Sequence, residues 1–190
     1  LFSNNGEIIS CNDIYSMNVR IARHIKTYGK YIAENFINSR NHLLITGKPA
    51  SGKRTLLRDI ASELSSNKIK VLVSDERNEI AAGFNGKYEF GLGPFCDVIS
   101  NCKKHISAEI AIRTMSPDVI IFDEIGFNDV DILKKLSNSG VFVIATLHSF
   151  GDGSNSFILN QLSNVGFTPT IVHLDNIGDL PRYDYTYAND

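Results

Sequence analysis

One segment constrains the fold of this chain more than any other: residues 42–64, which read "HLLITGKPASGKRTLLRDIASEL". A short apolar run leads into a glycine-rich loop, and the loop leads into a segment with apolar residues at helical spacing. The loop follows the pattern G-x-x-x-x-G-K, in which backbone N–H groups surround a phosphate at the start of a helix. The sequence therefore predicts a strand, a phosphate-binding loop and a helix in direct succession.

Apolar runs alternate with helical segments along the rest of the chain. Strands are predicted for "HLLIT", "IKVLV", "VIIF", "VFVIATLH" and "FTPTIVHL", and helices for residues 53–64, 103–115 and 129–136. These strands are apolar without alternation, which indicates a parallel sheet with helices on both faces. We expect an α/β fold of this kind, with the ligand site at the carboxyl ends of the strands.

Composition narrows the classes of function. The chain has 190 residues, enough for one compact domain, and its net charge is −2, so the total charge gives no sign of nucleic-acid binding. Three cysteines without C-x-x-C spacing argue against a disulfide framework or a zinc site. No apolar run approaches the ~20 residues of a membrane-spanning helix. We expect an N-terminal strand and amphipathic-helix segment at 1–40 and a nucleotide-binding domain at 41–190.

The phosphate loop departs from its pattern at one position. Its predicted nucleotide contacts are Gly47, Lys48, Pro49, Ala50, Ser51, Gly52, Lys53, Arg54 and Thr55. The residue after the lysine is normally Ser or Thr, whose hydroxyl binds Mg²⁺, and a guanidinium has donors only. Thr55 follows one residue later, rotated by about 100° around the helix, so we expect its side chain to face away from a metal.

Three arrangements are compatible with Arg54 at this position. Mg²⁺ is bound through water and Asp123 alone, or Arg54 itself neutralises phosphate, or the site binds nucleotide without hydrolysing it.

Further polar residues follow the other predicted strands. Asp123 and Glu124 end "VIIF", and we expect Asp123 to bind Mg²⁺ through water and Glu124 to orient or deprotonate the attacking water. Glu76, with Asp75, ends "IKVLV", and His148 ends "VFVIATLH". For each of these the alternative is a structural role, such as capping the next turn.

Taken together, these stretches resemble the stage III sporulation protein AA family of endospore-forming bacteria. The resemblance runs from about residue 8 to residue 150. It is carried by "SMNVRIAR", "GKPASGKRTLLRD", "SDERNEIAAG", "CDV" at 96–98, "AIRTMSPDVIIFDEIG" and "IATLHS".

This resemblance implies a RecA-like P-loop ATPase related to the motors of type II and type IV secretion. It implies ATP and Mg²⁺ as cofactors, a hexameric ring, and membrane-embedded channel proteins as partners. The expected location is the mother cell, peripheral to the membrane around the forespore. By position, Glu124 and Glu76 are the implied catalytic residues, His148 lines the site, and Arg113 is a candidate for an inter-subunit or phosphate contact.

Three departures from the family pattern predict weak turnover or none. Arg54 replaces the family's magnesium-binding threonine, and Phe95 and Phe127 stand where the family has arginines. The leading hypothesis is an ATPase of the sporulation channel, and the alternative is a non-catalytic nucleotide-binding ring subunit. A P-loop protein acting on single-stranded nucleic acid is a third hypothesis, which the near-neutral charge disfavours.

Overall fold

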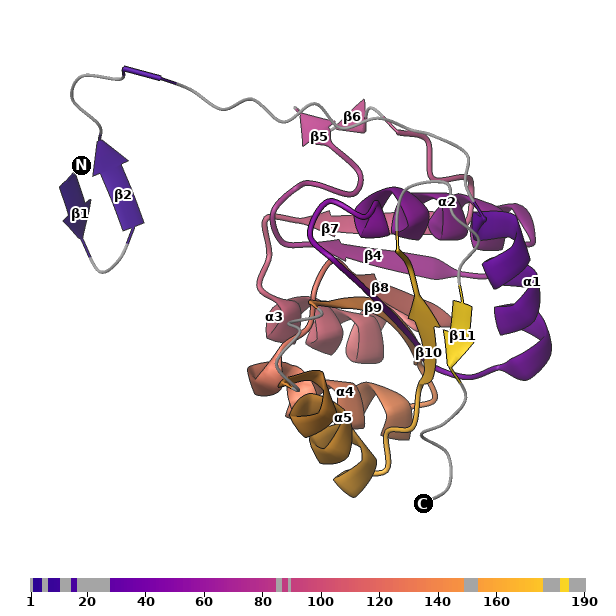
Figure 1. Cartoon of the computed structure of the whole chain (residues 1–190). Helices are drawn as coiled ribbons and strands as arrows, with labels where there is room; N and C mark the ends of the chain where they lie inside the picture. Colours follow the sequence, from indigo (N-terminus) through magenta and orange to yellow (C-terminus); the bar gives the residue numbers. More distant parts are fainter. Residues whose placement is uncertain are drawn as a thin grey trace.

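The computed structural model describes residues 2–4, 7–10, 15–16, 28–84, 87–88, 90–148, 154–175 and 182–184. Its main element is a seven-stranded sheet with the order β11-β10-β3-β9-β8-β4-β7 (Figure 1). The strands are β3 (Leu43–Gly47), β4 (Val71–Asp75), β7 (Cys96–Ser100), β8 (Val119–Phe122), β9 (Phe142–His148), β10 (Thr170–His173) and β11 (Arg182–Asp184). All neighbouring strands are parallel except β10 and β11. The predicted parallel α/β architecture is confirmed.

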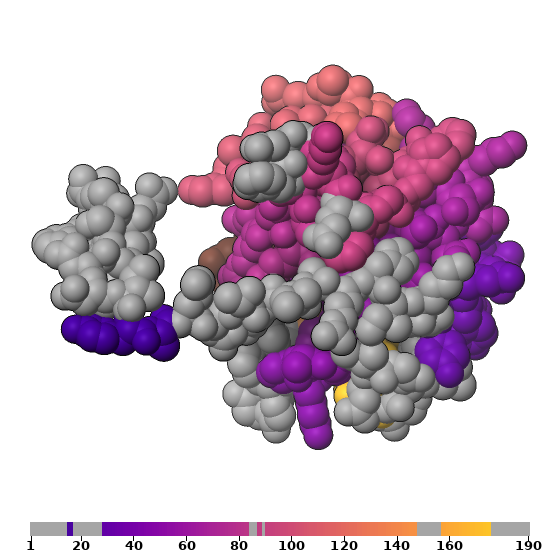
Figure 2. Space-filling view, turned by 90° about the horizontal axis from the view of Figure 1, so that it is seen from above, coloured from indigo at the N-terminus to yellow at the C-terminus, as the bar shows by residue number. Residues whose placement is uncertain are grey.

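Helices cover both faces of the sheet (Figure 1). On one face lie α1 (Gly29–Ser39) and α2 (Lys53–Ser66), and on the other lie α3 (Lys104–Ile110), α4 (Val130–Asn138) and α5 (Ser154–Asn164). A π-helical turn, η1 (Ala111–Met115), continues α3, and a 3-10 turn, η2 (Phe127–Asp129), precedes α4. Figure 2 looks onto the first face, where the indigo and purple atoms of α1 and α2 lie beside the magenta atoms of residues 71–100.

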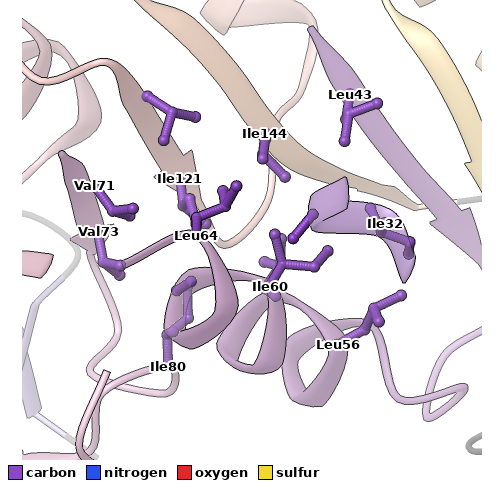
Figure 3. Packing of buried hydrophobic residues seen from close by; sticks show 14 of the residues in the cluster. Ile32, Leu43, Leu56, Ile60, Leu64, Val71, Val73, Ile80, Ile121 and Ile144 are labelled. Carbon is purple, nitrogen blue, oxygen red and sulfur yellow. The ribbon is translucent and has the colours of Figure 1, made fainter. Parts of the chain in front are cut away.

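The central strands are buried on both faces because their side chains alternate between two apolar clusters. Leu43 and Ile45 of β3 face the cluster under α1 and α2, whereas Leu44 faces the cluster under α4 and α5. In Figure 3, Ile60 and Leu64 of α2 are directed toward the sheet. Both sides of β3, β4 and β8 pack, which explains why the sequence shows continuous apolar runs there instead of alternation.

Several elements were not predicted. β7 is an edge strand with an exposed Asp97, and its mixed composition conceals it. Helix α5 lies in the C-terminal part that the sequence left uninterpreted. Two short hairpins, β1 (Phe2–Asn4) with β2 (Glu7–Ser10) and β5 (Gly83–Phe84) with β6 (Lys87–Tyr88), were also not predicted in detail.

The N-terminal amphipathic helix is described only in its second half. α1 begins at Gly29, and residues 17–27 of the predicted helix lie outside the described residues. The backbone N–H of Gly29 donates to the buried carboxylate of Asp59 in α2 at 3.0 Å. Ile32 and Phe36 of α1 belong to the same cluster as α2, so α1 packs on the sheet domain.

Strand order decides which residues meet at the carboxyl edge. β9 separates the loop-bearing strand β3 from β8, and β4 lies on the other side of β8. Because these four strands are parallel, the residues that follow them emerge at one edge of the sheet.

Candidate functional site

The phosphate loop connects the end of β3 at Gly47 to the start of α2 at Lys53. A Cβ atom on Gly47 would lie 2.3 Å from the carbonyl oxygen of Leu174 and 2.8 Å from Oγ of Ser51. Gly52, directly before α2, has a φ of 96°, in the left-handed region that favours glycine. Both glycines of the motif are therefore required by the backbone of the loop.

The loop has unused capacity for an anion. Ser51 is 4% exposed, and its hydroxyl has no hydrogen-bond partner among the described residues. The N-terminus of α2 has no side-chain cap, so its first N–H groups are available to a ligand. A phosphate group would satisfy both, and the residues present therefore fit the phosphates of a nucleotide.

Lys53 lies inside the loop. Its Nζ donates to the carbonyl oxygens of Gly47 at 2.7 Å and Lys48 at 2.8 Å. Burial lowers the pKa of Lys53 and the charge of Arg54 lowers it further, while the carboxylates of Glu124 and Asp123 oppose the shift. The charges of Lys53 and of both acidic residues are therefore close enough to influence one another.

Arg54 contacts the acidic residues directly. Its Nε donates to Oδ1 of Asp123 at 2.6 Å, and Oε2 of Glu79 lies 2.7 Å from the same nitrogen. Nε carries one hydrogen, so the contact with Glu79 is an ion pair without a hydrogen bond. Burial opposes the charge on Arg54, but the hydrogen bond to Asp123 and the nearby carboxylates outweigh it and raise the pKa of Arg54. Arg54 is therefore fully charged in the site.

Asp123 is fixed by the neighbouring strand. It follows β8, is 5% exposed, and its backbone carbonyl accepts a hydrogen bond from the hydroxyl of Thr146 in β9. The N–H of Ile125 donates to the carbonyl of Thr146 at 2.9 Å, which extends the connection to β9 past the end of β8. Thr146 thus has a structural role here.

The residues present do not fit a magnesium ion bound as in other phosphate loops. The hydroxyl that would bind it is replaced by Arg54, and the carboxylate of Asp123 is in contact with that same guanidinium. Thr55 is half-buried at the third position of α2. Within the described residues, no three His, Cys, Asp or Glu side chains are grouped so that they could bind a metal ion.

An open cleft of about 290 Å³ lies beside this cluster, at the ends of β4 and β8. Glu76 and Asp129 line it, and Lys104 forms ion pairs with both, at 3.5 Å and 3.3 Å. Phe127, which also lines the cleft, is 54% exposed, and its ring stacks on that of Phe157 in α5 with centroids 5.6 Å apart. The lining residues are Ser74, Glu76, Arg77, Lys104, Asp123, Glu124, Ile125, Gly126, Phe127, Asn128 and Asp129.

The two acidic residues after β4 have different environments. Asp75 is fully buried, and its carboxylate accepts backbone N–H groups from residues 79, 80 and 81 at 2.8–3.0 Å. Arg58 of α2 donates to the carbonyls of Glu79 and Ile80 in the same turn. Asp75 therefore shapes the turn that presents Glu76 to the cleft.

His148 and Arg113 are the two remaining residues that the sequence analysis assigned to the site. His148 is the last residue of β9, and its backbone lies opposite Gly47 in the sheet. Arg113 lies in η1 and pairs with Glu109 at 3.8 Å. Its neighbour Met115 accepts a hydrogen bond from Lys70, just before β4, so η1 is at the amino-end edge of the sheet. The structure thus does not bring Arg113 to its own chain's phosphate loop, and an inter-subunit contact stays a prediction.

Phe95 also lies at that amino-end edge, immediately before β7. An arginine there would be remote from the phosphate loop of the same chain. Of the two Phe departures, only Phe127 changes this chain's cleft.

Two residues of the site were not singled out from the sequence. Glu79 belongs to the acidic run after β4, and its pairing with Arg54 depends on the turn that Asp75 stabilises. Lys104 was missed because β7, the strand that precedes α3, was not recognised. A basic residue at the start of the helix that follows a strand would have been the signal for it.

Comparison with known proteins adds a family. A profile of the family described as "Sporulation stage III, protein AA" matches residues 3–187. Stage III sporulation protein AA of Bacillus subtilis (strain 168) is 37% identical over 157 residues, which cover 79% of this chain and 51% of that protein. The match covers about half the length of this relative and of a second curated one, the protein ycf45 of Cyanidium caldarium.

Solved structures of secretion ATPases have a similar fold. The ATPase DotB of Legionella pneumophila gives a TM-score of 0.55 at 20% identity, covering 74% of this chain and 43% of that chain. The VirB11 ATPase of the Brucella suis type IV secretion system gives 0.57 at 14% identity, covering 84% of this chain and 53% of that chain. The predicted RecA-like fold is confirmed. Among the described residues, no helix combines the length and apolarity that crossing a bilayer requires.

Proposed function

This chain belongs to the stage III sporulation protein AA family, and we propose that it binds ATP at residues 47–55 and hydrolyses it slowly or not at all. The observation that supports this most strongly is the junction of the two motifs. Lys53 lies inside a loop with an unpartnered buried hydroxyl, and Arg54 joins that loop to Asp123.

The same junction disfavours hydrolysis. Water attack on a γ-phosphate needs a positioned carboxylate and stabilisation of developing charge. Glu124 and Glu76 line the cleft and are the residues we propose for orienting water. Mg²⁺ has no hydroxyl ligand at position 54 and competes with a guanidinium at Asp123, so we propose that its direct protein ligand is weak or absent.

The wider role follows from the family. We propose a component of the stage III sporulation channel between mother cell and forespore, peripheral to the surrounding membrane, with membrane-embedded channel proteins as partners. A hexameric ring is proposed on the similarity of fold to secretion ATPases. The exposed Arg113 is then a candidate residue for the contact between subunits.

A second candidate function is a nucleotide-binding ring subunit that does not hydrolyse ATP. The contact between Arg54 and Asp123 favours it, because this contact involves the carboxylate that an active site would give to the metal.

Steady-state phosphate release by the parent chain and by Arg54→Thr tests the proposal. We expect slow or undetectable release from the parent and an increase of at least about tenfold in the variant, equivalent to ~1.4 kcal/mol of barrier. Lys53→Ala controls for a contaminating ATPase and should abolish release. A parent that turns over quickly and is slowed by Arg54→Thr would contradict the view that Arg54 impairs hydrolysis.

A further inference from the structure

Arg54 lies where a cation would bind, between two carboxylates. Its guanidinium lies between two carboxylates, with Nε 2.6 Å from Asp123 and 2.7 Å from Glu79. Both contacts use Nε, and within the described part of the chain the two Nη groups have no hydrogen-bond partner. A guanidinium offers five N–H donors in a planar fork that matches phosphate oxygens, so these groups remain for a ligand.

The carboxylates on both sides of Arg54 are positioned by the fold. The carbonyl of Asp123 is bonded to Thr146. Glu79 belongs to the turn fixed by the buried carboxylate of Asp75 and by Arg58, whose Nη2 donates to the Glu79 carbonyl at 3.0 Å. Arg58 in turn lies over the ring of Phe90, 4.1 Å from its centroid. Arg54 is therefore located in a preorganised site and is not a mobile surface side chain.

A metal ion and this guanidinium compete for the carboxylate of Asp123. Bringing Mg²⁺ to that carboxylate would place two cations side by side or require Arg54 to give up its contact with Asp123. The retained loop residues still fit phosphate, because the Ser51 hydroxyl, the α2 N-terminus and Lys53 do not depend on a metal.

We propose that Arg54 supplies from the chain itself the positive charge that magnesium supplies in other phosphate loops, so that the site binds metal-free adenosine di- and triphosphate. This inference rests on the proposed nucleotide site and names the form of the nucleotide that the site takes. The nucleotide's phosphates contact Lys53 and the Nη groups of Arg54, while Asp123 and Glu79 keep Arg54 in place.

Calorimetric titration of the full chain with ATP, once in excess EDTA and once in saturating magnesium, tests the inference. We expect the two affinities of the parent to agree within about threefold. Arg54→Thr should bind ATP at least about tenfold more weakly in EDTA and regain affinity in magnesium. Lys134→Thr, which removes one positive charge from the exposed side of α4, is the matched control and should leave both values unchanged.

A second variant, Asp123→Asn, distinguishes a site that uses Arg54 from a site that uses a metal ion. Asp123→Asn keeps an oxygen that can accept the Nε hydrogen of Arg54 but removes a negative charge that repels phosphate, so we expect ATP to bind up to about tenfold more tightly in EDTA. If Asp123 serves a metal instead, the same change weakens binding in magnesium and leaves binding in EDTA unaltered. This variant keeps the size of the side chain, so it also serves if Arg54→Thr does not fold.

The outcomes separate the inference from the proposal beneath it. A parent that binds ATP only with magnesium, and for which Arg54→Thr changes nothing in EDTA, overturns the inference and leaves the nucleotide site standing. Absence of ATP and ADP binding under both conditions overturns the nucleotide site and the inference together.

Discussion

The hydroxyl of Thr146 donates a hydrogen bond to the backbone carbonyl of Asp123, joining the middle strand β9 to the end of β8. Thr146 is 3% exposed, so the bond is shielded from water. The strand next to the phosphate loop therefore sets the position of the acidic residue that Arg54 contacts.

Thr146→Val is expected to lower the free energy of unfolding by about 1–3 kcal/mol, because it leaves a buried carbonyl without its donor while the side-chain shape stays nearly the same. Urea unfolding followed by circular dichroism measures this. Thr114→Val, at an exposed position of η1, is the control and should change the free energy of unfolding by less than about 0.5 kcal/mol. Equal stability of Thr146→Val and the parent would show that the bond is unimportant.

Gly47→Ala is expected to disable the phosphate loop while the fold is kept. The new Cβ would lie 2.3 Å from the carbonyl oxygen of Leu174, so either the loop or the end of β10 must move. Overpacking of this kind costs about 1–3 kcal/mol, and ATP affinity should fall at least about tenfold. Gly91→Ala, where an added Cβ meets nothing within 4 Å, is the matched control for both stability and binding. Unchanged ATP affinity in Gly47→Ala would argue against nucleotide binding at this loop.

His42 is a neutral histidine in the structure. Its Nδ1 accepts the N–H of Val143 at 3.0 Å, so Nε2 carries the proton and donates to the hydroxyl of Ser137 at 3.1 Å. The ring stacks on Phe167 with centroids 4.2 Å apart. Burial lowers the pKa of His42 from 6.5 to about 4.

The stability of the protein should therefore fall in mildly acidic solution. The unfolded chain takes up a proton at His42 below about pH 6.5 and the folded chain only near pH 4. The contribution of His42 is complete above pH 6.5, declines as the pH falls toward 4, and amounts to about 3 kcal/mol at most. Urea unfolding across this range should give a shallower pH dependence for His42→Gln than for the parent. His105→Gln, at an exposed position of α3, is the control for the removal of a histidine.

The sequence predicted the central strands because burial on both faces leaves continuous apolar runs such as "VIIF". It did not predict β7, because this strand lies at the edge of the sheet and is only partly buried, so "CDVIS" mixes polar and apolar residues. Helix α5 was missed for a related reason: its buried residues, Leu159 and Leu162, are few and lie among polar ones.

The site was predicted in part. The pattern at 47–53 identifies a loop whose glycines the backbone requires, and the acidic pair after "VIIF" does lie beside it. The sequence identified Arg54 as anomalous, but its two partners, Asp123 and Glu79, could not be predicted from spacing. Asp123 reaches Arg54 because only one strand separates β8 from β3. Glu79 reaches it because of the turn that follows β4. Arg113 shows a different limit: it precedes "VIIF", which in a parallel sheet places it at the amino-end edge, but its assignment to the site came from the family motif and did not use that order.

Arg58 has a mechanical consequence for the whole site. It lies one helical turn after Arg54 on α2, and its guanidinium is bonded to the backbone of residues 79 and 80. The helix that begins at the phosphate loop is therefore bonded, through one side chain, to the turn that follows Glu76 in the cleft wall.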